Sequence, residues 1–259
     1  MRSIWNGTIS FGLVSIPIKM YSGSEERTLD LDMLDKRDLA RIRYKRVNEV
    51  TGEEVEWKDI VKGYKEDDSY VVLEKEDFDK ANMKKSKTID IEEFIEEKDV
   101  ADVLFKKPYF LEPQKDGEKS YNLLKNALKD TGKLGVATFV MRAKENLSLI
   151  GVYKDALVLH VIRFADEIRD PADLKLPDTK VSKKEVDMAK SLIEQYTEEF
   201  DFEKYKDIYN EQLLKIIKAK RGGKKTKVEK FESKPTPAKD LMAQLKASLD
   251  KKKKKKTAS

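Results

Sequence analysis

Short apolar runs that alternate with polar positions dominate the first 165 residues of the chain. This period of two predicts strands over residues 10–21, 41–47, 53–61, 70–73, 109–111, 134–142, 149–153 and 156–163. Thr51-Gly52 separates the second and third runs and predicts a hairpin turn. Residues 120–129 repeat their apolar positions at helical spacing instead. Many strands with one or two helices are typical of a β-barrel or sandwich with insertions, so we expect a mixed, mainly β fold.

Helical spacing takes over in residues 176–222, which we expect to form a helical C-terminal arm. Ser182 followed by Glu185 has the spacing of a capping box and predicts the start of a first helix. The apolar stripe of this helix consists of Val186, Ala189, Ile193, Tyr196 and Phe200. A second helix is expected after Asp201, with a stripe of Tyr205, Ile208, Tyr209, Gln212, Leu213, Ile216 and Ile217. Gly222-Gly223 ends it.

Residues 223–259 have the composition of a flexible, lysine-rich tail. Within residues 240–249, Leu241, Leu245 and Leu249 recur at every fourth position. Ten residues alone form a marginal helix in water. This short amphipathic segment therefore either docks into a partner's groove or forms a transient helix without a partner. The chain nearly ends on a run of lysines, which are Lys251, Lys252, Lys253, Lys254, Lys255 and Lys256.

The net charge of +5 conceals an uneven distribution. Residues 218–259 carry a net charge of +12, whereas residues 1–217 carry −7. A basic tail on a mildly acidic body indicates a polyanionic partner, either nucleic acid or an anionic membrane surface. The absence of cysteine excludes disulfides and thiolate chemistry. We find no signal-peptide pattern and no run of about 20 apolar residues, so the sequence predicts a soluble protein of the cytoplasm.

Motifs of enzymes are mostly missing from the sequence, and we expect no catalytic activity and no cofactor. No phosphate-binding glycine loop is present. The single histidine, His160, lies inside a predicted strand and fits a structural role better than acid–base catalysis. Asp30 and Asp32 would share one face of a strand, which leaves a metal-dependent nuclease as an alternative. The simpler interpretation is that these two residues form the polar side of a half-buried strand.

The densest basic stretch outside the tail consists of Lys36, Arg37, Arg41, Arg43, Lys45 and Arg46. If residues 41–47 form a strand, Arg41, Arg43 and Lys45 share one face at intervals of about 6.8 Å, which is near the phosphate spacing over two nucleotides. The sequence equally allows an edge strand whose charges prevent aggregation. Arg142, Lys144 and Arg163 lie at strand ends and either line a groove or simply meet water. The lysine run is expected to bind DNA through its charge alone, and the alternative is a solubilising tail.

Several blocks of sequence, in order along the chain, resemble the bacterial Ku family. They are IWNGTISFGLVSIPIKMY at 4–21, RIRYKRV at 41–47, TGEEV at 51–55, IVKGY at 60–64, YVVL at 70–73, IDIEEF at 89–94, YFLEP at 109–113, KSYNLLKNAL at 119–128, TG at 131–132 and YKDIYNEQL at 205–213. Together they span nearly all of residues 1–220. Family members often carry histidines and a cysteine in the segment that matches residues 30–50, and this chain has neither there.

The resemblance implies a β-barrel core over residues 1–175 with an inserted bridge at about residues 25–65. It implies a helical arm over 176–222, followed by the tail at 223–259. It further implies a homodimer whose two bridges close a ring around duplex DNA, which places the protein at the nucleoid. The implied function is sequence-independent binding of DNA ends in non-homologous end joining. An ATP-dependent DNA ligase would be recruited through the C-terminal region. The other alternative is a general chromatin or RNA-binding protein that acts through its tail.

Overall fold

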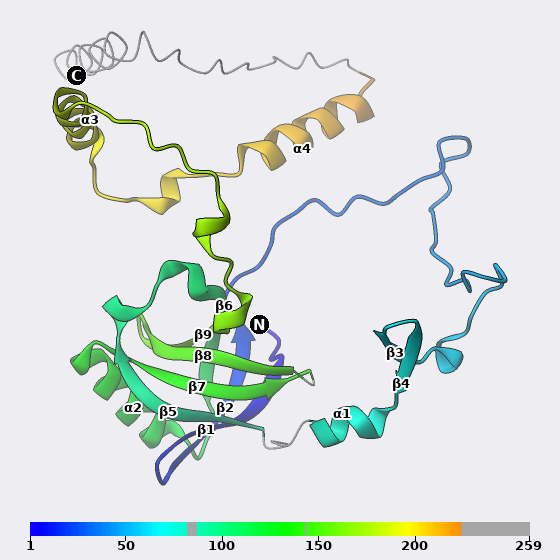
Figure 1. Cartoon of the computed structure of the whole chain (residues 1–259), viewed down its shortest axis with the longest axis horizontal. Helices are drawn as coiled ribbons and strands as arrows, with labels where there is room; N and C mark the ends of the chain where they lie inside the picture. The colour runs from blue at the N-terminus through cyan, green and yellow to red at the C-terminus, as the bar shows by residue number, and fades with distance from the viewer. Residues whose placement is uncertain (82–86, 143, 224–259) are drawn as a thin grey trace. The chain divides into compact units, whose positions relative to one another are not determined.

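The computed structural model describes residues 1–81, 87–142 and 144–223. The chain divides into two units, Met1–Pro171 and Ala172–Ser259. In the first unit, seven strands close into a barrel in the order β1-β2-β6-β9-β8-β7-β5 (Figure 1). Their bounds are β1 Trp5–Phe11, β2 Val14–Ser22, β5 Thr88–Glu96, β6 Phe105–Pro113, β7 Lys133–Met141, β8 Lys144–Tyr153 and β9 Ala156–Ile162. The predicted mixed, mainly β fold with a barrel core is confirmed.

The predicted strand over residues 10–21 is wrong, because a turn divides this run. β1 and β2 form an antiparallel hairpin in which Phe11 pairs with Val14. Gly12 occupies the turn with a φ of 57°, a left-handed conformation that glycine adopts without strain. The apolar run continues through the turn because Leu13 is fully exposed there, so the spacing of apolar residues gave no sign of the break. β1 also pairs with β5 in parallel, and this pairing closes the barrel.

Alternation of side chains along the strands builds the core inside the barrel. In β2, Ile16, Ile18 and Met20 are fully buried, as the period of two requires. The helix α2, Glu118–Thr131, adds three buried residues on one of its faces, Tyr121, Leu124 and Leu128. α2 ends at Gly132, whose φ of 65° completes a left-handed cap. The predicted helix over 120–129 and its glycine stop are confirmed.

A long insertion connects β2 to β5. We call residues 23–87 the insertion, and none of its described residues is buried. It contains a two-stranded hairpin, β3 Lys62–Glu66 with β4 Ser69–Leu73, and the helix α1, Lys75–Ala81. The predicted bridge at about residues 25–65 lies within the insertion. The turn expected at Thr51-Gly52 is confirmed, since Gly52 has a φ of 71° and its N–H donates to the carbonyl of Asn48.

The strands predicted at 41–47 and 53–61 are wrong. The insertion makes only isolated bridges there, Leu34 with Arg41 and Val47 with Glu54. Part of the second run forms a short 3-10 helix, η1, at Trp57–Asp59. A strand needs a neighbour for its backbone hydrogen bonds along its length, and a single chain provides one only at these isolated bridges.

The second unit contains two described helices, α3 Lys183–Tyr196 and α4 Ile208–Arg221. The capping box is confirmed, since the Ser182 hydroxyl accepts from the N–H of Glu185 and the Glu185 side chain reaches back to Ser182. The second helix begins later than expected: Asp207 caps α4, and only a 3-10 turn, η6 Phe202–Lys204, follows Asp201. None of the described residues of this unit is buried.

The remaining 3-10 turns connect elements of the barrel and lead out of it. They are η2 Glu97–Asp99, η3 Asp102–Leu104, η4 Ala165–Glu167 and η5 Pro171–Asp173. Among the helices of the described residues, none combines the length and the apolar character needed to cross a membrane.

Removing the hydroxyl of Tyr121 should destabilise the barrel. This buried hydroxyl donates to the carbonyl of Leu111 and accepts from the N–H of Leu157, both at 2.8 Å. Tyr121→Phe leaves both groups unpaired, and we expect a loss of about 1–3 kcal/mol in the free energy of unfolding. Urea unfolding followed by the fluorescence of Trp5, in a Trp57→Phe background, measures it. Tyr153→Phe is the control, because that ring is half exposed. Equal stability of the two variants would contradict the assigned hydrogen bonds.

Candidate nucleic-acid interface

The basic stretch of the insertion is fully exposed, and several of its cations are held by acids nearby in sequence. Arg37 forms a bidentate pair with Asp35, with Nη2 and Oδ2 2.6 Å apart. Arg41 pairs with Asp32. The ammonium of Lys45 lies 2.7 Å from a carboxylate oxygen of Glu54 across the Val47–Glu54 bridge.

Two of these ion pairs shift a pKa, but ion pairs of this kind hold their members weakly. Hydrogen bonds from Arg37 lower the pKa of Asp35, and the hydrogen bond with Glu54 raises the pKa of Lys45. Apart from Asp35, whose side chain is partly covered, these side chains stand in solvent, where ion pairs contribute little to stability. A polyanion can therefore replace the carboxylates, and its own charge density would favour that exchange.

The two other arginines of the stretch have different surroundings. The guanidinium of Arg46 lies over the ring of Trp57, 4.7 Å from its centroid. Arg43 is exposed and forms no ion pair within the described residues, and the same holds for Lys36. Residues 42–46 belong to no strand, so the structure does not place Arg41, Arg43 and Lys45 on one face of a strand as the spacing predicted.

The cations at the strand ends fall into two groups. Arg142 is exposed with a φ of 55° at the end of β7, and the ammonium of Lys144 lies 3.9 Å from Glu167. Their role in binding DNA stays a prediction. Arg163 was expected to line a groove or meet water, and its half-buried side chain has a structural role besides. Its guanidinium donates to the carbonyls of Val103 and Phe105, both at 2.7 Å, so it fastens the segment before β6 to the end of β9.

The remaining predicted site residues lie outside the described residues. They are the lysine run, Lys251–Lys256, and the leucines Leu241, Leu245 and Leu249. The alternative of a nuclease centred on Asp30 and Asp32 gains no support from the geometry. Asp32 is paired with Arg41, and the described residues contain no group of three histidine, cysteine or carboxylate side chains placed to hold a metal ion.

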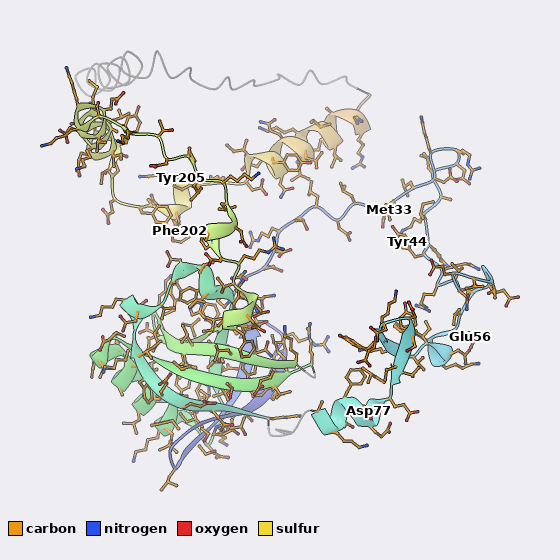
Figure 2. All side chains as sticks on the ribbon, viewed as in Figure 1. Met33, Tyr44, Glu56, Asp77, Phe202 and Tyr205 are labelled. Atoms are coloured by element: carbon orange, nitrogen blue, oxygen red, sulfur yellow. The ribbon has the colours of Figure 1, made fainter. Side chains whose placement is uncertain are left out.

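Exposed apolar side chains of the insertion are a feature that the sequence interpretation missed. They are Leu31, Met33, Leu34, Leu39, Ile42, Tyr44, Val47, Val50, Trp57, Ile60, Val61, Tyr64, Tyr70, Val71 and Val72. Their contacts are few and local: the hydroxyl of Tyr44, for example, lies 3.3 Å from the sulfur of Met33 (Figure 2). The number of large apolar residues in this part of the sequence could have revealed the feature, because a solvated loop rarely contains so many.

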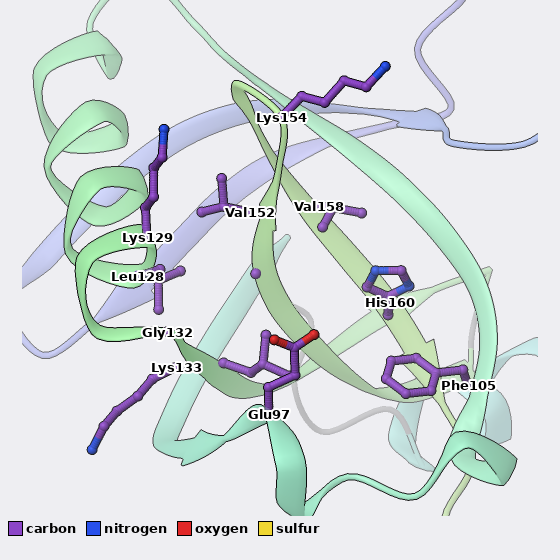
Figure 3. A pocket seen from close by; sticks show the side chains of 12 residues that line it. Glu97, Phe105, Leu128, Lys129, Gly132, Lys133, Val152, Lys154, Val158 and His160 are labelled. Atoms are coloured by element: carbon purple, nitrogen blue, oxygen red, sulfur yellow. The ribbon is translucent and has the colours of Figure 1, made fainter. Parts of the chain in front are cut away.

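His160 lies in a cavity of about 630 Å³ on the barrel (Figure 3). Its ring is half-buried and meets the ring of Phe105 edge to face, with centroids 5.3 Å apart. Burial lowers the pKa of His160, and the nearby carboxylate of Glu97 opposes this effect weakly. The edge-to-face contact with Phe105 is a packing contact of the kind expected for a structural ring.

The chain is thus a β-barrel protein with a long, charged insertion between β2 and β5, in which no described residue is buried. The family model described as the Ku70/Ku80 beta-barrel domain matches residues 10–188. The chain belongs to the Ku family.

Curated relatives agree with this assignment over most of the chain. A protein of Cupriavidus necator is 41% identical over 232 residues, which cover 87% of this chain and 68% of that protein. A relative in Opitutus terrae is 39% identical and covers 96% and 92%, and one in Archaeoglobus fulgidus is 36% identical and covers 96% and 99%. Each of these relatives is named "Non-homologous end joining protein Ku".

Solved structures add little. The SPOC domain of human PHD-finger protein 3 aligns with 62% of this chain and 95% of its own length. The sequence identity is 14% and the TM-score is 0.30, a likeness too weak to support any argument.

The stability of the barrel should fall as the pH drops from about 7.5 to about 5.5 because of His160. Its pKa in the folded chain lies below the unfolded value of 6.5, so the unfolded chain takes up the proton first. The contribution of His160 to the free energy of unfolding is therefore fully present above the unfolded pKa and is lost as the pH falls through the folded pKa. Thermal unfolding at a series of pH values measures this decline. His160→Gln, which removes the only histidine, should flatten the curve in this interval. An unchanged slope in the variant would refute the assignment.

Proposed function

We propose that this chain binds the ends of double-stranded DNA without reading their sequence, as a homodimeric ring that acts in non-homologous end joining. Membership of the Ku family and the names of the relatives support the end-joining role. The observation that carries the proposal is the insertion, which combines exposed apolar side chains with a cluster of cations and has no core of its own.

The exposed apolar side chains of the insertion support the dimer. Water around so many large apolar groups is unfavourable, and a second protein surface removes it. A second copy of the same insertion is the simplest partner, because two-fold symmetry places the same surface on both sides of an interface. In this proposal, residues 25–65 of the two copies form the bridges that meet and enclose the duplex.

The cations of the insertion support contact with phosphates rather than with bases. Arginine and lysine paired with exposed carboxylates can exchange these acids for the phosphates of DNA. Such contacts position a duplex and carry no sequence information. A closed ring that touches only the backbone must be threaded from an end, so preference for ends follows from topology without residues that read the end.

The C-terminal unit and the tail are proposed to recruit the ATP-dependent DNA ligase of end joining. The described helices support this role because their apolar stripes are exposed, with Ile193, Tyr196, Tyr209 and Ile217 among them. In this proposal Leu241, Leu245 and Leu249 bind the ligase as well, and the lysine run Lys251–Lys256 adds contacts to DNA at the nucleoid. We propose no catalytic step for the chain itself.

Linear duplex should bind the full chain much more tightly than closed circular duplex at moderate salt. A ring can thread onto an open end, whereas a closed circle offers none. Competition of the two DNAs for a labelled linear fragment measures the preference. The same experiment with a chain that ends at residue 220 controls for the lysine tail. Equal competition by both DNAs with the shortened chain would refute the ring, and loss of all binding in that chain would assign DNA binding to the tail.

Substitutions of Lys45 and of Glu54, which form an ion pair, should change the affinity for DNA in opposite directions. Lys45→Glu, alone or with Arg43→Glu, should weaken binding to DNA of every sequence to the same extent. The slope of the logarithm of affinity against the logarithm of salt concentration should become less steep by about one for each lost phosphate contact. Glu54→Gln should strengthen binding, because it frees Lys45 and removes a negative charge from the path of the phosphates. Titrations at several salt concentrations measure both effects. Weaker binding in both variants would show that the pair is structural instead.

A further inference from the structure

Another cavity of the barrel unit is lined by residues of β2, β6 and α2 and of the turn between β8 and β9. Its volume is about 930 Å³, which lies within the range of small-ligand sites. We call it the aromatic cavity after three of the rings that line it, Tyr21, Phe110 and Tyr153. Its lining also contains three carboxylates, which are Glu112, Glu118 and Asp155. The cavity thus combines ring faces with negative charge.

The strands of the barrel bring the aromatic rings together. Phe110 and Glu112 lie on the outer face of β6, because Leu111 between them is buried in the core. Tyr21 of β2 is the partner of Phe110 in the strand pairing. The ring of Phe110 stacks with that of Tyr153, with centroids 6.1 Å apart and an angle of 26° between the planes. Tyr153 is 49% exposed, so this aromatic surface is open to solvent.

The polar groups of the aromatic cavity contact other residues of its own lining. The hydroxyl of Tyr21 donates a hydrogen bond to the carboxylate of Glu112. That bond raises the pKa of Tyr21, so the hydroxyl keeps its proton and remains a donor. The ammonium of Lys154 lies over the ring of Tyr153, 5.5 Å from its centroid. A carboxylate, a hydroxyl and a cation therefore meet at one aromatic surface.

The position of Lys154 indicates which kind of group this surface attracts. The face of a tyrosine ring is negative and attracts a cation, and Lys154 is an exposed side chain that a stronger ligand can displace. A guanidinium suits the surface better than an ammonium, because it is planar, stacks on rings and binds a carboxylate through two parallel hydrogen bonds. Tyr21 occupies only one oxygen of Glu112, and the other has no hydrogen bond within the described residues.

The two other carboxylates of the cavity extend its negative charge beyond the aromatic surface. Glu118 and Asp155 form no ion pair in the part of the chain that the structure describes. Lys125 does not neutralise them, since its ammonium lies 3.5 Å from the backbone carbonyl of Asp155. The described residues contain no group of acids placed to share a metal ion, so these carboxylates suit a ligand with several separate cations.

We infer that the aromatic cavity binds an arginine side chain on a basic peptide segment of a partner protein. The guanidinium replaces the ammonium of Lys154 on the stacked rings and pairs with Glu112, while further cations of the peptide face Glu118 and Asp155. The partner must supply the arginine, because residues 222–259 of this chain contain none.

This site is independent of the proposed binding of DNA. The aromatic cavity uses none of the cations of the insertion, and its carboxylates repel phosphates. A partner could therefore bind there while the chain holds a duplex.

A peptide of alternating arginine and alanine should bind the full chain about tenfold more tightly than the same peptide with lysine, because only the guanidinium both stacks and pairs with two hydrogen bonds. Isothermal titration calorimetry at moderate salt, without DNA, measures both affinities. Tyr153→Leu should weaken binding of the arginine peptide by about tenfold, whereas Tyr153→Phe keeps the ring and should preserve it.

Substitutions of the charged lining residues should act in opposite directions. Glu112→Gln should weaken binding of the arginine peptide by about tenfold, because a charge-assisted pair is lost. Lys154→Gln should strengthen it several-fold, because the competing cation leaves the ring of Tyr153. Glu93→Gln, at an exposed carboxylate of β5 outside the cavity, is the matched control and should leave the affinity unchanged.

Three results would overturn the inference. Equal affinity for the arginine and lysine peptides would show that only net charge attracts them. Equal affinity of Tyr153→Leu and Tyr153→Phe for the arginine peptide would show that the ring takes no part. Weaker binding in Lys154→Gln would show that this lysine supports the cavity and does not compete for it. Circular dichroism checks that each variant is folded, and unchanged binding of linear duplex by the variants separates this site from the proposed function.

Discussion

Side chains from all seven strands and from α2 are buried together in one hydrophobic core. Ile9, Ile89, Phe139 and Leu159 come from different strands and join one cluster, so no strand of the barrel can be removed without opening it. The parallel pairing of β1 with β5 closes this interior, and it joins two strands separated by the whole insertion. Because the barrel buries its own apolar surface, it can carry long segments that bury none.

Those segments are the insertion and the C-terminal unit, in which no described residue is buried. Both expose large apolar side chains, and the insertion adds cations whose ion pairs stand in solvent. Such pairs hold arginine and lysine in place at little cost and release them to a stronger anion. The buried core thus lies in the barrel, while many exposed apolar and cationic side chains lie on segments that bury no described residue.

The sequence predicted which basic residues make up the candidate site, but it did not predict how they are arranged or paired. The basic stretch from Lys36 to Arg46 is visible in the sequence, but its longer-range pairs depend on two turns of the insertion. Arg41 meets Asp32 across the turn at residues 35–40, and Lys45 meets Glu54 across the turn at Asn48–Gly52. The strand expected at 41–47 did not form because alternation specifies a strand only where another strand pairs with it. Arg163 looked like a surface cation and instead holds two carbonyls of a segment about sixty residues away.

Local patterns in the sequence predicted the mainly β character, α2 with its glycine stop, and the Ser182 cap of α3, since side-chain periodicity and caps act over a few residues. The barrel and the family were predictable from the blocks of sequence that resemble Ku, because periodicity alone left a barrel or a sandwich open. The hairpin at Gly12, the closure of β1 on β5, and the bonds of Arg163 to the carbonyls of Val103 and Phe105 are visible only in the tertiary structure. These depend on contacts between distant residues, which no local pattern encodes.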